Sequence, residues 1–308
     1  MTSNRVGCVL GLMAALAGWL GMSPLFAHGE QAGSVDQASA GSLETFYYPD
    51  GQKAREGMVV NGRRAGVWKG WYPSGKLAYE GAFERYLREG PWTFYAEDGS
   101  KLEQGNYQGG EREGVWKRFY PDGQVQIEGP WVAGRQEGEQ LEYRPGGILG
   151  ARYHMVAGLR EGPSSSYGPK GNIQQQGDYH RNSRRGTWTF YQGEGVVRSR
   201  GEFDRNQENG FWRFYFPEGE VEAQGSFLDG KQSGSWVGYH PDGKIRFQGT
   251  FQEGLAAGEW THYWPGGLRQ SHGSMKHGQR DGWWDEYDEF GRPDGDKSGF
   301  YVEGKRQP

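Results

Sequence analysis

The sequence predicts an all-β protein, an elongated single-layer antiparallel meander of about eleven tandem 24-residue β-hairpin repeats, twisted or superhelical. Three observations predict it. Leading glycines recur every 24 residues, an aromatic residue stands five positions after each, and a second glycine stands nine positions after each. The leading glycines are Gly66, Gly90, Gly114, Gly138, Gly162, Gly186, Gly210, Gly234, Gly258 and Gly282. An unbroken period of this length indicates one small unit copied in tandem.

The composition agrees with packed β-structure. Glycine accounts for 55 of the 308 residues, far above the usual share of about 7%. So much glycine alone would indicate disorder, but it is accompanied by 13 Trp, 18 Tyr and 15 Phe. Each aromatic side chain can bury about 150–250 Å², so the aromatics supply most of the apolar burial. Glycine every few residues also disfavours helix.

Each unit, counted from its leading glycine as position 0, contains two predicted strands and two turns. The strands cover about +1 to +6 and about +10 to +18, where aromatic residues favour a pleated surface. Pro121-Asp122-Gly123 represents the turn between them, a type I turn closed by a glycine bulge. Glycine or asparagine at +20 turns the chain into the next unit. The clearest structural repeat positions are Gly66, Trp68, Gly75, Gly90, Trp92, Gly114, Trp116, Gly123, Trp188, Trp212, Trp236, Trp260 and Trp284.

A further glycine at +15 falls inside the second strand, where glycine ordinarily weakens pairing. Either an aromatic ring lies across its bare backbone or it marks a bulge, and the sequence leaves both open. The array begins with an incomplete copy at residue 42. Its last copy, from Gly282, is stretched by two residues before Gly299.

The N-terminal segment resembles a secretory signal. Arg5 precedes an apolar stretch from Val9 to Leu20, and Ala27 ends a cleavage-like sequence. We predict a signal peptide over 1–27, a flexible linker over 28–41 and the repeat array over 42–306. The alternative is an uncleaved membrane anchor. The predicted localisation is periplasmic or secreted.

Charge and residue types exclude several functions. Cleavage after Ala27 leaves 34 basic and 39 acidic residues, a net charge of −5 (34 − 39), which argues against nucleic acid as a partner. The only cysteine, Cys8, is removed, so disulfides and thiol catalysis are excluded. The histidines show no metal-ligand spacing. Carboxylates recur at turns, as turn chemistry requires. We therefore predict no catalytic, cofactor-binding or metal-binding residues.

The fourth and fifth copies depart from the pattern. Position +2 is Trp in eight of ten copies but Gln140 and Ser164 here. Tyr153 replaces the +15 glycine and Met155 replaces the +17 aromatic. These four residues form our candidate partner-binding surface, within degenerate copies spanning 138–185. They would provide a docking surface or a flexible joint; the alternative is neutral drift in a redundant repeat.

The pattern Gly-x-Trp-x-x-Tyr-x-Pro-Asp-Gly, followed by Gly-x-aromatic-x-x-Gly, resembles MORN repeats. Gly210 to Gly219 is similar to the bacterial MORN variant, and the resemblance covers about 42–306. It implies an elongated single-layer sheet of hairpins. It also implies scaffold roles, contacts with lipid or protein, or a role as an antitoxin component.

From these observations we expect an exported, non-enzymatic scaffold that binds protein in the cell envelope. Two alternatives stay open. One is an aromatic-lined binder of envelope polysaccharide or lipid headgroups at a membrane surface, since aromatic rings stack on sugars and on cationic groups. The other is an antitoxin or immunity protein that occludes a toxin.

Overall fold

The computed structural model describes residues 31–32 and 41–308. The predicted signal peptide lies outside the described residues, as does most of the predicted linker. Within the described part the chain contains strands and turns and no helix.

The strands follow one another along the chain with short turns between them. They are β1 (Gln31–Ala32), β2 (Ser42–Tyr47), β3 (Lys53–Val60), β4 (Arg63–Trp71), β5 (Leu77–Glu84), β6 (Leu87–Tyr95), β7 (Lys101–Gln108), β8 (Glu111–Phe119), β9 (Val125–Val132), β10 (Arg135–Gln136), β11 (Gly138–Tyr143), β12 (Leu149–Val156), β13 (Leu159–Tyr167), β14 (Ile173–His180), β15 (Ser183–Gln192), β16 (Val196–Asp204), β17 (Gln207–Tyr215), β18 (Val221–Leu228), β19 (Lys231–Tyr239), β20 (Ile245–Gln252), β21 (Leu255–Tyr263), β22 (Arg269–Lys276), β23 (Gln279–Glu286), β24 (Gly299–Val302) and β25 (Lys305–Arg306).

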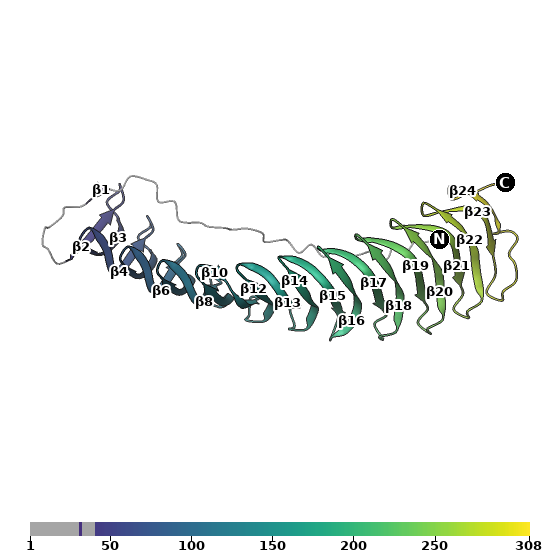
Figure 1. Ribbon diagram of the computed structural model, residues 1–308, viewed down its shortest axis with the longest axis horizontal. Helices are drawn as coiled ribbons and strands as arrows, with labels where there is room; N and C mark the ends of the chain where they lie inside the picture. Colours follow the sequence, from purple (N-terminus) through teal and green to yellow (C-terminus); the bar gives the residue numbers. More distant parts are fainter. Residues whose placement is uncertain (1–30, 33–40) are drawn as a thin grey trace.

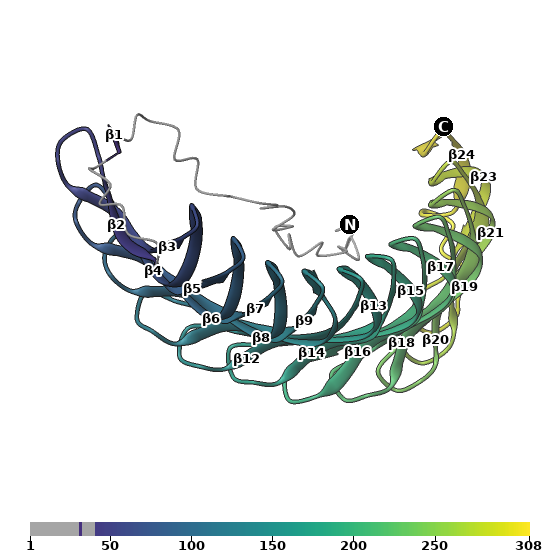
Figure 2. The same cartoon turned by 60° about the vertical axis from the view of Figure 1, so that its left-hand side comes forward.

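All strands belong to one antiparallel sheet in which each strand pairs with the next in sequence. β10 and β11 both pair with β9 and act as one strand interrupted at Glu137. The sheet is open, single-layered and strongly curved, and its strands turn progressively from one end to the other (Figure 1, Figure 2). The predicted all-β meander is therefore confirmed.

The two predicted turns are confirmed. In the unit that begins at Gly114, the Gly123 amide donates to the Tyr120 carbonyl (2.9 Å), and Gly123 has a φ of 85°. The Asp122 carboxylate also accepts from the Gln124 amide at 3.0 Å. At the other end of the hairpins, both turn residues have positive φ, as in Ala133 (46°) and Gly134 (75°), the geometry of a two-residue type I′ turn.

The leading glycines lie inside a strand, which corrects the predicted strand start at +1. β4 begins at Arg63, so Gly66 lies within it and has a φ of 65°. The pairing of β3 with β4 steps from Gly57↔Trp68 to Met58↔Ala65, leaving two residues of β4 unpaired on that side. Gly66 is thus one of two bulged residues. All ten leading glycines have positive φ, where a side chain would be strained, and this explains why none is replaced.

The glycine at +15 lies beneath an aromatic ring, which confirms the first of the two alternatives for this position. The bulge lies on the facing strand, at the leading glycine. A Cβ atom added at Gly105 would overlap the indole of Trp116. The Trp116 Nε1 donates to the Asn106 carbonyl at 2.9 Å, ten residues earlier. The same donation to the tenth preceding carbonyl recurs at Trp68, Trp92, Trp188, Trp212, Trp236, Trp260 and Trp284.

The last unit accommodates its predicted insertion in the irregular segment between β23 and β24. Gly299 pairs with Trp284 and so occupies the +15 place. No further tryptophan follows, and the Arg306 side chain lies over Gly299 instead. Its guanidinium donates to the carbonyls of Asp296 (2.7 Å) and Ser298 (2.6 Å), which closes this end of the array.

Candidate functional site: a polar break in the tryptophan row

One face of the sheet carries the tryptophans, and we call it the tryptophan face. Positions −2, +2, +4, +13 and +17 point to it. Six of the eight tryptophans contact the +17 ring of the preceding unit edge-on, as Trp116 does with Tyr107 (5.0 Å between centroids, 85°). The +4 rings stack beside the indoles, as Phe94 does beside Trp92 (5.8 Å, 26°). This ladder buries the indoles although the sheet has a single layer.

The ladder is interrupted between Trp116 and Trp188. Its buried aromatic clusters centre on Trp92 and Trp116 on one side and on Trp188 and Trp212 on the other. Between them, position +4 is Arg118, Glu142 and Ser166 in successive units. The buried Ser166 hydroxyl has no hydrogen-bond partner among the described residues. Arg118, Glu142 and Ser166 thus form a polar break between the two aromatic clusters.

Gln140 occupies the place of a tryptophan. It is 1% exposed, and its side-chain amide donates to the Pro130 carbonyl at 3.0 Å, ten residues earlier. Gln140 therefore reproduces the hydrogen bond of the indole without the ring. Gly129 beneath it keeps the bare backbone that an indole needs, since an added Cβ there would overlap the Gln140 amide.

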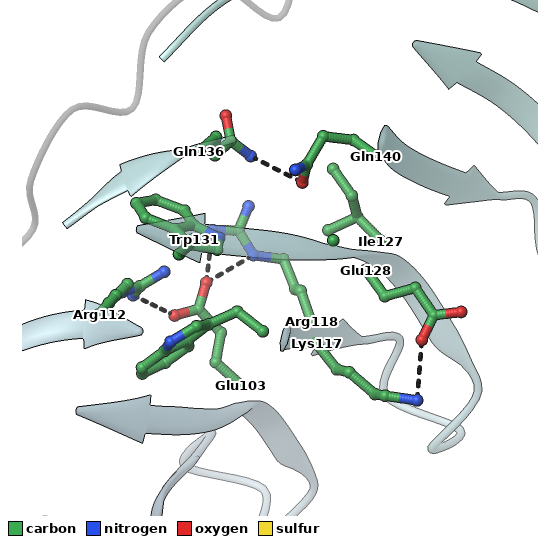
Figure 3. A pocket seen from close by; sticks show the side chains of 11 residues that line it. Glu103, Arg112, Lys117, Arg118, Ile127, Glu128, Trp131, Gln136 and Gln140 are labelled. Atoms are coloured by element: carbon green, nitrogen blue, oxygen red, sulfur yellow. Dashed lines mark hydrogen bonds and ion pairs between the residues drawn. The ribbon is translucent and has the colours of Figure 1, made fainter. Parts of the chain in front are cut away.

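A cavity of about 70 Å³ lies beside Gln140. Figure 3 shows Arg112 and Arg118 converging on Glu103 while Gln136 reaches Gln140. Glu103 accepts from Arg112 (2.6 Å) and from Arg118 (2.5 Å). The two cations and one carboxylate leave a net charge of +1 at a cavity floored by Trp116 and Trp131. The site suits a small polar group such as a carboxylate or an amide.

The next unit solves the same packing problem differently. Tyr153 stands opposite Ser164 in the pairing of β12 with β13. The ring has moved to the +15 position, and the small serine occupies the +2 position. Tyr153 is 6% exposed, and its burial raises the pKa of its hydroxyl, an effect that the nearby Arg160 opposes. This is an exchange of ring and small residue across one strand pair.

The candidate partner-binding residues are therefore mostly interior. Gln140, Tyr153 and Met155 are buried, and Ser164 is half-buried. They lie on one face, but they form the packing of the break rather than an exposed docking surface. Of the four, Gln140 also lines the cavity described above. Strand pairing continues through residues 138–185.

Three regular features were missed in the sequence. The first is arginine at −2, whose guanidinium lies over the +2 ring, as Arg112 lies over Trp116 (4.0 Å). The second is glutamate at −1, which accepts from the turn of the next hairpin; Glu113, for example, binds the Ala133 amide at 3.0 Å. The third is a donor at +6 that reaches a carbonyl 23 residues later. Tyr48, Tyr72, Tyr120, Arg144, His240 and Trp264 all do so. The Arg-Glu-Gly triplets at 88–90 and 112–114 were the available signal for the first two.

Replacing Gln140 with tryptophan is expected to stabilise the array. The cavity would be filled, the Pro130 carbonyl would keep its donor, and Gly129 already leaves room. Filling about 70 Å³ corresponds to roughly 1–2 kcal/mol in the free energy of unfolding. Urea denaturation and hydrogen exchange of residues 112–156 would measure it, with Q108W, at an exposed position that does not line the cavity, as the control. A destabilised Q140W would mean that the indole does not fit.

His262 replaces the +4 aromatic near the C-terminal end. Its ring stacks on Trp260 (6.0 Å between centroids, 26°), and its Nδ1 lies 3.2 Å from the Ser271 hydroxyl. Burial lowers the pKa of His262 below its ordinary value of 6.5, and the charges of Arg280 and Arg246 lower it further. The neutral imidazole is therefore the form that fits the ladder.

The sign of the resulting pH dependence follows from linkage. A histidine with a lowered folded-state pKa binds fewer protons when folded, so stability is fully present above 6.5 and falls as pH drops below it. We expect the C-terminal hairpins to lose stability as pH falls below about 6.5. H262Q should flatten this dependence, as measured by thermal unfolding, whereas H277N at an exposed turn should not. Equal slopes for wild type and H262Q would contradict the assignment.

The described residues contain no cluster of three or more His, Cys, Asp or Glu side chains that could hold a metal ion. Over the same residues, no helix is long and apolar enough to cross a membrane.

The fold and this site define an all-β protein of tandem hairpins. The repeated glycines and tryptophans hold the sheet together, and the residues beside them vary from unit to unit. The profile described as "MORN repeat variant" matches residues 64–84, 88–108, 112–133 and 232–253. The chain therefore contains MORN-type repeats. Such repeats generally mediate contacts with proteins or membrane surfaces, and their all-β fold is typical of non-catalytic repeat proteins.

No curated protein matches the chain significantly. Among solved structures, three crystal structures of TcdB2-TccC3 match about 80% of this chain: the TEV form, the Cdc42 form and the form without the hypervariable C-terminal region. Identities are 10%, 10% and 11%, and TM-scores are 0.18, 0.19 and 0.19. This chain spans only 15%, 14% and 14% of the length of those chains. These scores do not establish a shared fold.

Proposed function

We propose that this chain is exported to the cell envelope and acts there as a non-catalytic scaffold that holds partner proteins along its sheet. The carrying observation is the contrast between fixed and variable rows. Position 0 is glycine in all ten units, and positions +2 and +15 keep Trp and Gly outside the fourth and fifth copies, whereas half-buried and exposed positions beside them change from unit to unit. At −2, for example, arginine gives way to Glu208, Gln232 and Ala256. One continuous sheet thus offers different chemistry along its length.

Site-specific photo-crosslinking in living cells tests the scaffold role. A photoreactive phenylalanine analogue would replace exposed residues on the back face, such as Val67 and Val115, or on the tryptophan face, such as Arg118. We expect discrete protein adducts that differ between positions. Uniform absence of protein adducts, with lipid or glycan adducts in their place, would overturn the scaffold role.

Export rests on the apolar segment from Val9 to Leu20 and the cleavage-like sequence ending at Ala27. Cell fractionation of a C-terminally tagged chain should place it in the envelope or the medium. N-terminal sequencing should begin at His28. Envelope-bound protein that retains its N-terminal segment would instead support the anchor alternative.

A glycan-binding role is the second candidate, favoured by an exposed aromatic pair on the back face. Trp283 and Phe300 face each other across β23 and β24 and are 58% and 49% exposed. The Trp283 Nε1 donates to Asp285 Oδ1 at 2.8 Å, which orients the ring. Glycan-array binding that W283A abolishes would support this role. The toxin-neutralising alternative stays a prediction, which co-expression with a neighbouring toxin gene would test.

A further inference from the structure

A row of arginines runs along the tryptophan face at position −2. It consists of Arg64, Arg88, Arg112, Arg160 and Arg184 and is interrupted once, by Gln136. Each guanidinium lies over the +2 ring of its own unit or, for Arg160, over Tyr153 on the facing strand, with distances between 4.0 and 4.8 Å. We call this set the arginine row. The rings hold the guanidinium groups in place, so little side-chain entropy remains to be lost on binding.

Most of this charge is not neutralised within the described part of the molecule. Arg88 donates to the Tyr107 hydroxyl (2.9 Å) and Arg184 to the Gln175 amide oxygen (3.3 Å), both neutral groups. Arg160 has an aromatic partner and no carboxylate at ion-pair distance among the described residues. Arg112 alone of these four is in an ion pair, with Glu103.

The charge is confined to one part of the face. From Arg64 to Arg184, rows −2, +4 and +13 carry six arginines and two glutamates, a net charge of +4 (6 − 2). From Phe190 to Glu286 the same rows carry one arginine and two glutamates, a net charge of −1 (1 − 2). The whole chain has a net charge of −4. The positive stretch is therefore a local feature that favours an anionic partner.

The spacing of the row selects a partner geometry. Successive units are two strands apart, so neighbouring arginines are about 10 Å apart along the sheet. A polyproline II segment has three residues per turn and rises about 3.1 Å per residue, or about 9 Å per turn. Acidic residues at every third position of such a segment therefore share one side and match the arginine period. A regular β-strand places same-side residues about 7 Å apart and falls out of register.

We propose that the tryptophan face between Arg64 and Arg184 binds an acidic, polyproline II-like segment of a partner protein that carries a carboxylate at every third residue. This rests on the proposed scaffold role and names its partner chemistry. Charge complementarity favours a flexible acidic segment over a folded domain, because carboxylates at that period reach successive arginines across a curved sheet. Each arginine presents a planar fork to its carboxylate.

Fluorescence anisotropy with the full chain tests the proposal. The probe is a labelled peptide of repeated Glu-Pro-Ser triplets; the control peptide has the same composition with its glutamates contiguous. We expect the periodic peptide to bind about tenfold more tightly than the clustered one, and its binding to weaken as salt rises. Equal binding of the two peptides, or binding of neither, would overturn the proposal.

Matched variants locate the site. R88Q/R160Q/R184Q should lose about tenfold in affinity for the periodic peptide, whereas R152Q/R198Q/R200Q, with the same charge change on the back face, should not. R88K/R160K/R184K keeps the charge and should retain intermediate binding, so a loss caused by misfolding is distinguishable. Back-face variants that weaken binding equally would contradict the assignment.

Cosedimentation with phosphatidylglycerol vesicles separates the two anion sources. Vesicle binding that depends on the arginine row and exceeds peptide binding would overturn the protein partner. Protein crosslinks elsewhere on the sheet without peptide binding would leave the scaffold role standing and remove only this inference. Absence of both protein crosslinks and peptide binding would overturn the scaffold role and this inference together.

Discussion

Replacing Gly105 with alanine is expected to lower the free energy of unfolding around β7 and β8 by about 3 kcal/mol or more. The new Cβ would overlap the Trp116 indole. Trp116 is buried, contacts Tyr107 and Phe94, and donates to the Asn106 carbonyl. The ring must leave its place, and both contacts and the hydrogen bond are lost with it. Hydrogen exchange of residues 101–119 measures the local effect, which suits a chain whose stability is a sum over neighbouring units.

The same substitution one unit later is the matched control. Gly129 faces Gln140, whose flexible amide can shift away from a new Cβ. G129A should therefore cost about 1 kcal/mol, the worth of the Gln140 hydrogen bond to Pro130. Equal losses for G105A and G129A would mean that the +15 glycine serves the backbone and not the ring.

Much of the fold could be predicted because each repeat position has a local physical reason. The 24-residue period, the Pro121-Asp122-Gly123 turn and the ring-over-glycine arrangement all depend on residues within one or two units. The bulge at the leading glycine was not predicted. Its signal is a positive φ at Gly66, and a glycine before a strand looks the same in sequence as a glycine inside one.

The candidate site was only half predictable. Gln140, Tyr153, Met155 and Ser164 were recognised as departures from the repeat, but their burial depends on which strand faces which. Read singly, Tyr153 and Ser164 look like two independent losses of the pattern. Once β12 and β13 are paired, they become one exchange. The arginine row was missed for the same reason, because a guanidinium above a ring is a contact between positions −2 and +2 that composition does not reveal.

The exchange at Tyr153 and Ser164 makes a quantitative prediction. Y153G should destabilise the pairing of the fourth and fifth copies by about 3–5 kcal/mol, because it removes a buried ring and leaves a cavity. S164W should also destabilise it, by about 1–3 kcal/mol, because two rings would compete for the space opposite Ser164. The double variant Y153G/S164W restores the repeat pattern, with an indole over a glycine and Arg160 above the ring.

The double variant should therefore be close to wild type in stability, and the coupling energy of the cycle should exceed about 3 kcal/mol. Urea denaturation of the four chains measures it, and hydrogen exchange of residues 149–167 localises it. The pair T187S and G177A around Trp188 supplies a reference: G177A should be costly, because Trp188 already covers Gly177, and T187S should be nearly neutral. Additive losses in the Y153G/S164W cycle would show that the two residues changed independently. A large coupling would establish that the degenerate copies keep the packing rule of the array, which is one ring over one small residue in each strand pair. The positions that can change to suit a binding partner would then be those beside the rings.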